Sequence, residues 1–200
     1  MNPAGSLRIL EGHTLQLDAW MLTVLQSSGM GCLILREGLV RVAIHTSPPE
    51  PAKAPRITLA FLQGGDWLPL DLLRHEPLVL QALQTTLLEP EVAALPPAGA
   101  TSLHDWTLAL LRIRHLTEAE QRIGGVLRLL VQRIGRRGRD WYEIPLRLTH
   151  AELAELSGHT RVTVTRQLSR WRSLGLIEAD PGLEGFLRLA PALVEAGRRG

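Results

Sequence analysis

Apolar residues change their spacing about halfway along this 200-residue chain. In the first half they form short runs that glycine and proline interrupt, chiefly at 15–17, 32–35, 39–44 and 57–62. The larger apolar side chains of the run LVRVAI alternate with Arg41 and Ala43, which is the period of a strand with one buried face. The pattern predicts an antiparallel β-roll over residues 1–100, with the proline-rich segment 47–55 as a loop.

Helical spacing begins after the segment 95–102, LPPAGATS, whose prolines and glycine break the strand pattern. Apolar residues then recur at intervals of three, four and three, at Leu103, Trp106, Leu110 and Ile113. These are the a and d positions of a helix seam, so the sequence predicts a dimerisation helix within 101–117. The same stripe would equally pack inside its own chain, and this alternative stays open.

The region 118–200 is predicted to begin with another helix. Thr117 is followed three residues later by Glu120, which predicts a capping box at the helix start. The buried face of this helix is expected at Ile123, Val126, Leu127, Leu130, Val131 and Ile134. Gly135 and the segment RRGRD mark its end.

The segment 149–177 predicts a pair of short helices around a tight turn. Thr149 and Glu152 have the spacing of a capping box, which places the start of the first helix at about His150. Its apolar side consists of Ala151, Leu153, Ala154 and Leu156. Gly158 suits the turn, because glycine adopts a positive φ without steric cost, and Thr160 is predicted to cap the second helix. The buried stripe of the second helix is expected at Val164, Leu168 and Trp171.

The other face of this second helix is strongly basic, since four arginines and no acidic residue lie between Thr160 and Gly175. A guanidinium matches the O6 and N7 edge of guanine, a threonine hydroxyl suits a phosphate, and a valine can lie on a thymine methyl group. The pattern predicts a DNA recognition helix, and the alternative is an ordinary basic surface helix. Two apolar runs, 176–178 and 186–189, predict a hairpin wing with an acidic loop.

Charge is uneven along the chain, although the net charge is only +2. Residues 101–139 hold 8 basic and 3 acidic side chains, whereas 1–100 hold 6 and 9, and 140–200 hold 8 and 8. Most of the central excess lies just before the helix pair, at Arg122, Arg128, Arg133, Arg136, Arg137 and Arg139. These arginines either widen a DNA-binding surface or form the solvated face of a helix.

Composition limits the chemistry of the first half. The single cysteine, Cys32, excludes an intramolecular disulfide and an iron–sulfur cluster, which normally needs four thiolates. Haem or a metal site is not expected, because the histidines show no HxH motif or comparable spacing. The residues that could in principle supply a ligand are Cys32, His13, His45, His75 and His104. A small metal-dependent β-roll enzyme is therefore kept only as the alternative function. With no leader sequence and no apolar run approaching ~20 residues, the chain is expected to be cytoplasmic and not in a membrane.

The stretch GHTRVTVTRQLSRWRSLGLI resembles the signature of the catabolite-activator/Fnr superfamily of bacterial transcription regulators. Within it, RVTVTR is most similar to the cyanobacterial nitrogen regulator NtcA, and LREGLVRV and GGDWLPL resemble the superfamily's β-roll. On this resemblance, base readout is assigned to Arg161, Val162 and Arg166. Phosphate contacts are assigned to Thr149, His150, Thr160, Thr163 and Arg170. Many members carry glutamate where this chain has Val162, so the departure implies a half-site of the GTA type.

The resemblance implies an α+β fold: an N-terminal cyclic-nucleotide-binding-like β-roll, a central dimerisation helix and a C-terminal winged helix-turn-helix. It also implies a homodimer on a palindromic site in duplex DNA, with RNA polymerase as a further partner. The phosphate cradle of cAMP-binding members is not found, because Gly65 and Asp66 are followed only by Arg74 and His75 where an Arg-Ser or Arg-Thr pair is required. The chain is therefore expected not to bind cAMP. Another small-molecule effector, a protein partner or its own abundance is expected to control it.

Overall fold

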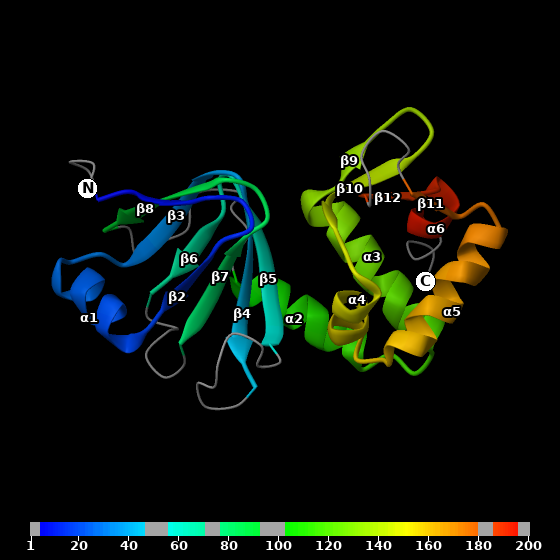
Figure 1. Ribbon diagram of the computed structural model, residues 1–200, viewed down its shortest axis with the longest axis horizontal. Coiled ribbons are helices and arrows are strands. Elements are labelled where there is room, and N and C mark those ends of the chain that lie inside the picture. Colours follow the sequence, from blue (N-terminus) through cyan, green and yellow to red (C-terminus); the bar gives the residue numbers. More distant parts are fainter. Residues whose placement is uncertain (1–4, 47–55, 71–76, 93–102, 180–185, 196–200) are drawn as a thin grey trace. The chain divides into compact units, whose positions relative to one another are not determined.

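The computed structural model of the chain describes residues 5–46, 56–70, 77–92, 103–179 and 186–195. The chain divides into two compact units, residues 1–108 and 109–200 (Figure 1). Several predicted features lie outside the described residues: the loop 47–55, the break at 95–102, the residues Arg74 and His75, and the loop of the wing.

The first unit, in its described residues, consists of two antiparallel four-stranded sheets, which confirms the predicted β-roll. One sheet has the order β1 (Leu7–Ile9), β8 (Thr86–Glu91), β3 (Cys32–Glu37) and β6 (Trp67–Pro69). The other has the order β2 (Thr14–Leu17), β7 (Leu78–Ala82), β4 (Leu39–His45) and β5 (Arg56–Gln63). Figure 1 draws these strands in colours from blue to green. The core contains the buried side chains Leu33, Leu35, Val40 and Val42.

The two strands predicted on either side of REG do form, but they lie in different sheets. β3 pairs with β6 and β8, whereas β4 pairs with β5 and β7. The chain passes from one sheet to the other at Gly38, whose φ of 91° is rarely adopted by other residues. A Cβ at this position would collide with the carbonyl oxygen of Thr85. Gly38 therefore allows the sharp change of direction by which β3 and β4, neighbours in the sequence, enter separate sheets.

Helix α1 (Ala19–Ser27) was not predicted from the apolar pattern. The carboxylate of Asp18 accepts a hydrogen bond from the backbone N–H of Met21, 2.9 Å away, as a helix N-cap does. An aspartate followed by nine residues without glycine or proline is the local signal that identifies this helix.

Helix α2 (Leu103–Arg114) forms within the range of the predicted dimerisation helix, but it buries most of the predicted seam in its own chain. Leu103, Trp106 and Leu110 are all buried. Trp106 is only 1% exposed, and its ring meets Phe61 of β5 edge to face, with ring centroids 5.8 Å apart. The large apolar side chains that α2 exposes are instead Leu108 and Leu111, at 40% and 51%. The spacing correctly predicted that Leu103, Trp106 and Leu110 are buried. They are buried in the core of their own chain, so their assignment to a dimer interface was wrong.

The second unit contains α3 (Ala119–Ile134), α4 (His150–Ser157), α5 (Arg161–Ser173) and α6 (Pro191–Glu195). Its sheet has the order β11 (Ile177–Ala179), β12 (Phe186–Leu189), β10 (Tyr142–Arg147) and β9 (Arg136–Arg137). β11 and β12 form the predicted wing hairpin, and β9 and β10, which the sequence pattern did not predict, extend the same sheet. The C-terminal winged helix-turn-helix is thus confirmed.

The predicted capping box of Thr117 and Glu120 does not form, because α3 begins at Ala119 with Glu118 as an N-cap that makes no side-chain cap. The Glu120 carboxylate lies 3.4 Å from the Arg170 guanidinium of α5 instead. A contact between distant residues has replaced the local cap that the spacing indicated.

Candidate nucleic-acid interface

The first helix of the pair begins and ends as the sequence predicts. Thr149 Oγ1 accepts from Glu152 N at 3.1 Å, and the Glu152 carboxylate accepts from Thr149 N at 2.8 Å, which completes the capping box. α4 ends at Gly158, whose φ is 68°. Leu153, Ala154 and Leu156 form the buried apolar side, as predicted. Ala151 is exposed, so its assignment to this side was wrong.

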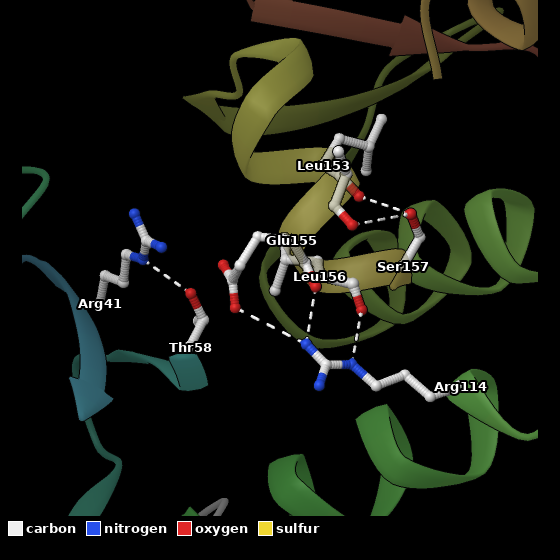
Figure 2. A network of polar contacts seen from close by, with 8 residues as sticks. Arg41, Thr58, Arg114, Leu153, Glu155, Leu156 and Ser157 are labelled. Carbon is white, nitrogen blue, oxygen red and sulfur yellow. Dashed lines mark hydrogen bonds and ion pairs between the residues drawn. The ribbon is translucent and has the colours of Figure 1, made fainter. Parts of the chain in front are cut away.

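Ser157 completes the buried side of α4, which the sequence pattern did not predict because serine is polar. Its hydroxyl donates to the carbonyl oxygen of Leu153 at 2.7 Å, inside its own helix (Figure 2). This bond removes the cost of burying the hydroxyl, so the residue behaves as a small core side chain.

Helix α5 is anchored by the predicted stripe. Val164, Leu168 and Trp171 are all at most 1% exposed. The Thr160 hydroxyl caps the helix by accepting from Thr163 N at 3.2 Å. At the other end Gly175 has a φ of 66°, and Leu176 N donates to Trp171 O at 2.9 Å, a Schellman termination. Both ends of the recognition helix are therefore fixed by local hydrogen bonds.

Helix α3 supports α5 through a glycine. A Cβ built on Gly124 would lie 3.6 Å from the Trp171 ring and 3.2 Å from the Arg128 guanidinium. The absence of a side chain lets α3 approach the Trp171 ring closely, and burial lowers the pKa of Arg128 beside it. Arg128 is therefore a packing residue beneath α5 and not part of an outward basic surface.

The outer face of α5 carries the predicted base-reading residues. Arg161, Val162 and Arg166 are all exposed, Val162 to 77%. Within the described part of the chain, neither the Arg161 nor the Arg166 guanidinium makes a side-chain hydrogen bond or an ion pair. The N–H groups of both side chains are thus available to an external acceptor, and no acidic residue of α5 opposes an anionic ligand.

His150 joins the start of α4 to α5. Its Nδ1 lies 2.8 Å from Thr165 Oγ1, and the Thr165 hydroxyl donates to Arg161 O at 2.9 Å. Since the hydroxyl proton is used on that carbonyl, the imidazole donates through Nδ1, and Nε2 is its other polar atom. Burial, followed by the charges of Arg172 and Arg161, lowers the pKa of His150. The free protein therefore holds this histidine mainly neutral at neutral pH.

The remaining predicted phosphate residues already have partners in the chain. The hydroxyls of Thr160 and Thr163 lie 3.0 Å apart, and that of Thr149 belongs to the capping box. The Arg170 guanidinium faces Glu120, and both side chains are more than half exposed. An ion pair that exposed is weak, so Arg170 can exchange Glu120 for a phosphate at little cost.

The six arginines of the central cluster do not form one surface. Arg122, Arg128 and Arg133 are half-buried, whereas Arg136, Arg137 and Arg139 are exposed on and after β9. The Arg137 guanidinium lies 5.3 Å from the centre of the Tyr142 ring on β10. Only the exposed β9 hairpin keeps the basic character that the sequence indicated for the whole cluster.

The polar candidates of the first unit are scattered. Cys32 is buried, and desolvation, with a smaller effect of Glu91, raises the pKa of its thiol. His13 and His104 are exposed, whereas Nδ1 of His45 is buried and has no hydrogen-bond partner among the residues that the structure describes. Across the described ranges, no three His, Cys, Asp or Glu side chains come together as metal ligands, and no helix is long and apolar enough to cross a membrane.

Asp66, the acidic residue of the GGD stretch, serves the turn before β6. It is buried, and its carboxylate accepts from Gln63 N at 2.9 Å. The turn is completed by Gly65 N, which donates to Leu35 O at 2.8 Å. The carboxylate is therefore committed to the local backbone.

Residues 121–194 match the model of the Crp-like helix-turn-helix domain. The chain is also 44% identical over 152 residues to "Regulatory protein CysR" of Synechococcus elongatus, an alignment that covers 72% of this chain and 69% of that protein. The chain belongs to the Crp/Fnr family of transcription regulators. The family and the Crp-like helix-turn-helix domain support DNA binding. The alternative of a β-roll enzyme is set aside, since the relatives are regulators.

Solved structures of the Crp/Fnr family share the whole fold. The regulator TTHA1359 of Thermus thermophilus has a TM-score of 0.66 at 18% identity, covering 95% of this chain and 98% of that one. TTHB099 of the same organism has a TM-score of 0.63 at 21% identity, with 95% of each chain covered. The β-roll, the central helix and the winged helix-turn-helix are therefore elements that this chain shares with the fold of these structures.

Proposed function

We propose that this regulator binds a palindromic DNA site as a homodimer, with α5 of each copy in successive major grooves about 34 Å apart. That spacing is a general property of two-fold helix-turn-helix dimers, the catabolite activator among them. The observation that carries the proposal is the outer face of α5, where Arg161 and Arg166 are exposed and unpaired in the described residues. Such a regulator acts where the bacterial chromosome lies, in the cytoplasm, and RNA polymerase is the partner through which it affects transcription.

The residues of α5 divide into two roles. Arg161 and Arg166 read guanine edges through bidentate hydrogen bonds, and Val162 lies against a thymine methyl group. The phosphate contacts come from Thr149 and His150 at the start of α4, from Thr160 and Thr163 at the start of α5, and from Arg170 in the last turn of α5. His150 makes its contact as the imidazolium, because a neutral ring that donates through Nδ1 has no proton on Nε2. Val162 cannot hydrogen-bond to cytosine, so the half-site is of the GTA type, as the similarity of RVTVTR to NtcA implies.

A selection from random duplexes tests this proposal. The full-length protein is expected to enrich an inverted repeat of a GTA-type half-site, with half-site centres about one helical turn, or a multiple of it, apart. Enrichment of a TGTGA-type half-site would contradict the role of Val162. Enrichment of single half-sites would contradict the homodimer, and no enrichment would contradict base readout by α5.

The proposed dimer contact lies on the exposed side of α2. Leu108 and Leu111 are three residues apart on that helix and are 40% and 51% exposed. Residues three apart are neighbours on a helix surface, so the two leucines form one apolar strip. Pairing of two such strips replaces the seam that the apolar spacing indicated, whose residues Leu103, Trp106 and Leu110 are buried in their own chain.

The proposal includes no cAMP. This is supported by Asp66, whose carboxylate accepts a hydrogen bond from the backbone N–H of Gln63. Asp66 lies in the stretch where cAMP-binding members build their phosphate cradle. Calorimetric titration of the purified protein with cAMP is expected to give no heat of binding, and measurable binding would overturn this part. Control then comes from another small molecule, a protein partner or the abundance of the regulator. Native mass spectrometry of the purified protein distinguishes the first of these from the others.

A further inference from the structure

A side chain from outside the helix-turn-helix binds the end of its first helix. Arg114, the last residue of α2, donates from Nη2 to the carbonyl oxygen of Glu155 at 2.6 Å and from Nε to that of Leu156 at 3.3 Å. The same Nη2 lies 3.7 Å from the Glu155 carboxylate. Figure 2 shows the guanidinium turned toward these oxygens at the end of α4. None of these contacts is used in the DNA contacts proposed above.

Both carbonyls lie in the last turn of α4. The last turn of an α-helix has carbonyl oxygens without i+4 donors and carries the negative end of the helix dipole. His159 N donates to Ala154 O at 2.9 Å, and Gly158 N donates to Glu155 O at 3.3 Å. These two amides bind the carbonyls of Ala154 and Glu155, and the carbonyl of the next residue, Leu156, accepts from Arg114. The planar guanidinium therefore completes the end of α4 by binding two adjacent carbonyls.

The turn after α4 also lies against Arg114. A Cβ built on Gly158 would be 3.8 Å from Arg114 Cγ and 3.9 Å from Arg122 Nη1. Thr160, the N-cap of the recognition helix, follows Gly158 by only two residues. The end of α2 is itself held on α3, because the Ile113 side chain would be 3.2 Å from a Cβ built on Gly125. The start of α5 is thus connected to α2 by a short chain of contacts within the second unit.

We infer that Arg114 is a positioning residue for DNA recognition, which holds the turn before α5 without touching DNA. The inference rests on base readout by α5. Base contacts require the recognition helix to be placed to within a fraction of an ångström, whereas binding to any duplex depends mainly on positive charge near phosphates. Loosening the turn therefore reduces binding to the specific site more than binding to random DNA.

The test compares the full-length protein with its Arg114→Ala, Arg114→Lys and Arg112→Ala variants. Fluorescence anisotropy measures the affinity of each for the selected duplex and for a scrambled duplex. Arg114→Ala should weaken binding to the selected duplex about tenfold and to the scrambled one about twofold or less. Arg114→Lys should give an intermediate loss, because an ammonium keeps the charge but cannot span two carbonyls as a planar fork does.

Arg112→Ala is the matched control, since Arg112 is exposed on the same last turn of α2 and its replacement removes the same charge. It should leave the ratio of the two affinities unchanged. An equal loss on both duplexes for Arg114→Ala, or a loss fully restored by lysine, would show that only the charge matters and would overturn the inference. If Arg114→Ala lowers the thermal midpoint so far that α4 unfolds, the lysine variant decides by the same ratio.

Amide hydrogen exchange in the absence of DNA measures the hold on the turn directly. Residues 157–160 should exchange at least about threefold faster in Arg114→Lys than in the wild type, with no change in Arg112→Ala. Unchanged exchange would overturn the inference. A wild-type protein that does not prefer the selected duplex would instead overturn the proposed function. The two failures are therefore distinguishable.

Discussion

Helices α2 and α5 each bury three apolar residues spaced three or four apart, but their outward faces differ. α2 buries Leu103, Trp106 and Leu110, and α5 buries Val164, Leu168 and Trp171. The exposed face of α5 carries guanidinium and hydroxyl groups, whereas that of α2 presents Leu108 and Leu111. The buried stripe stabilises each helix in its unit, and the opposite face determines the partner, which is DNA for α5 and, in our proposal, a second copy for α2.

The largest effect is expected from the tryptophans of the two stripes. Trp171→Ala and Trp106→Ala should each lower the free energy of unfolding of their own unit by about 3 to 5 kcal/mol, because each leaves a large cavity. Both side chains are 1% exposed. Urea unfolding of the full chain measures the loss. Val162→Ala on the outer face of α5 is the control and should change stability by less than about 0.5 kcal/mol. If Trp106→Ala left the stability unchanged, Trp106 would not be a core residue of its unit and would belong to the dimer interface that the spacing first predicted.

A smaller effect is expected from the outward face of α2. Aspartate at both Leu108 and Leu111 should weaken the dimer by roughly 2 to 3 kcal/mol, because half-exposed leucines would no longer be buried against a second copy. Sedimentation velocity over a range of protein concentrations should then show monomer. Aspartate at Val92, an exposed apolar residue outside α2, adds charge without touching this strip and should leave the dimer intact. A double variant that still sediments as a dimer would exclude α2 as the contact.

The outward face of α5 should respond residue by residue. Arg166→Ala should cost about 1 to 3 kcal/mol of DNA-binding free energy and relax the preference at one base pair, since a bidentate base contact is lost. Thr163→Ala should weaken binding by a smaller amount and evenly across sequences. Binding measured on a panel of single-base variants of the selected site separates the two patterns. Equal losses on every duplex for both substitutions would mean that Arg166 contacts only the backbone.

The helix-turn-helix could be predicted almost residue by residue because its signals are local. The capping box of Thr149 and Glu152, the turn at Gly158 and the cap at Thr160 each depend on residues within about four positions of one another. The β-roll could be predicted only as a set of strands. β4 was identified from its alternation, but it pairs both with β5, the next strand, and with β7, more than thirty residues further on, and no local signal encodes the second pairing.

The errors have the same origin. Apolar spacing in α2 correctly predicted which side chains are buried, but not that Phe61 of a distant strand would cover Trp106. The capping box at Thr117 does not form, and the Glu120 carboxylate lies beside Arg170, fifty positions away, instead. The role of Arg114 also depends on α4 carbonyls that lie far from it in the sequence. The spacing of residue types along the chain does not determine which distant residues come into contact.

The smallest expected effect is a pH dependence of the stability of the second unit, which contains His150 and His159. Burial, followed by Arg172 and Arg161, lowers the pKa of His150, and burial, followed by Arg122, lowers that of His159, both from 6.5. The folded second unit therefore binds fewer protons than its unfolded chain, so its stability should be full above about pH 6.5 and decline as the pH falls toward the lowered values. Urea unfolding near pH 7.5, 6.5 and 5.5, roughly spanning the ordinary histidine range, measures the decline. Replacing both histidines with glutamine should flatten this dependence, and a double variant with the wild-type slope would show that other groups cause it.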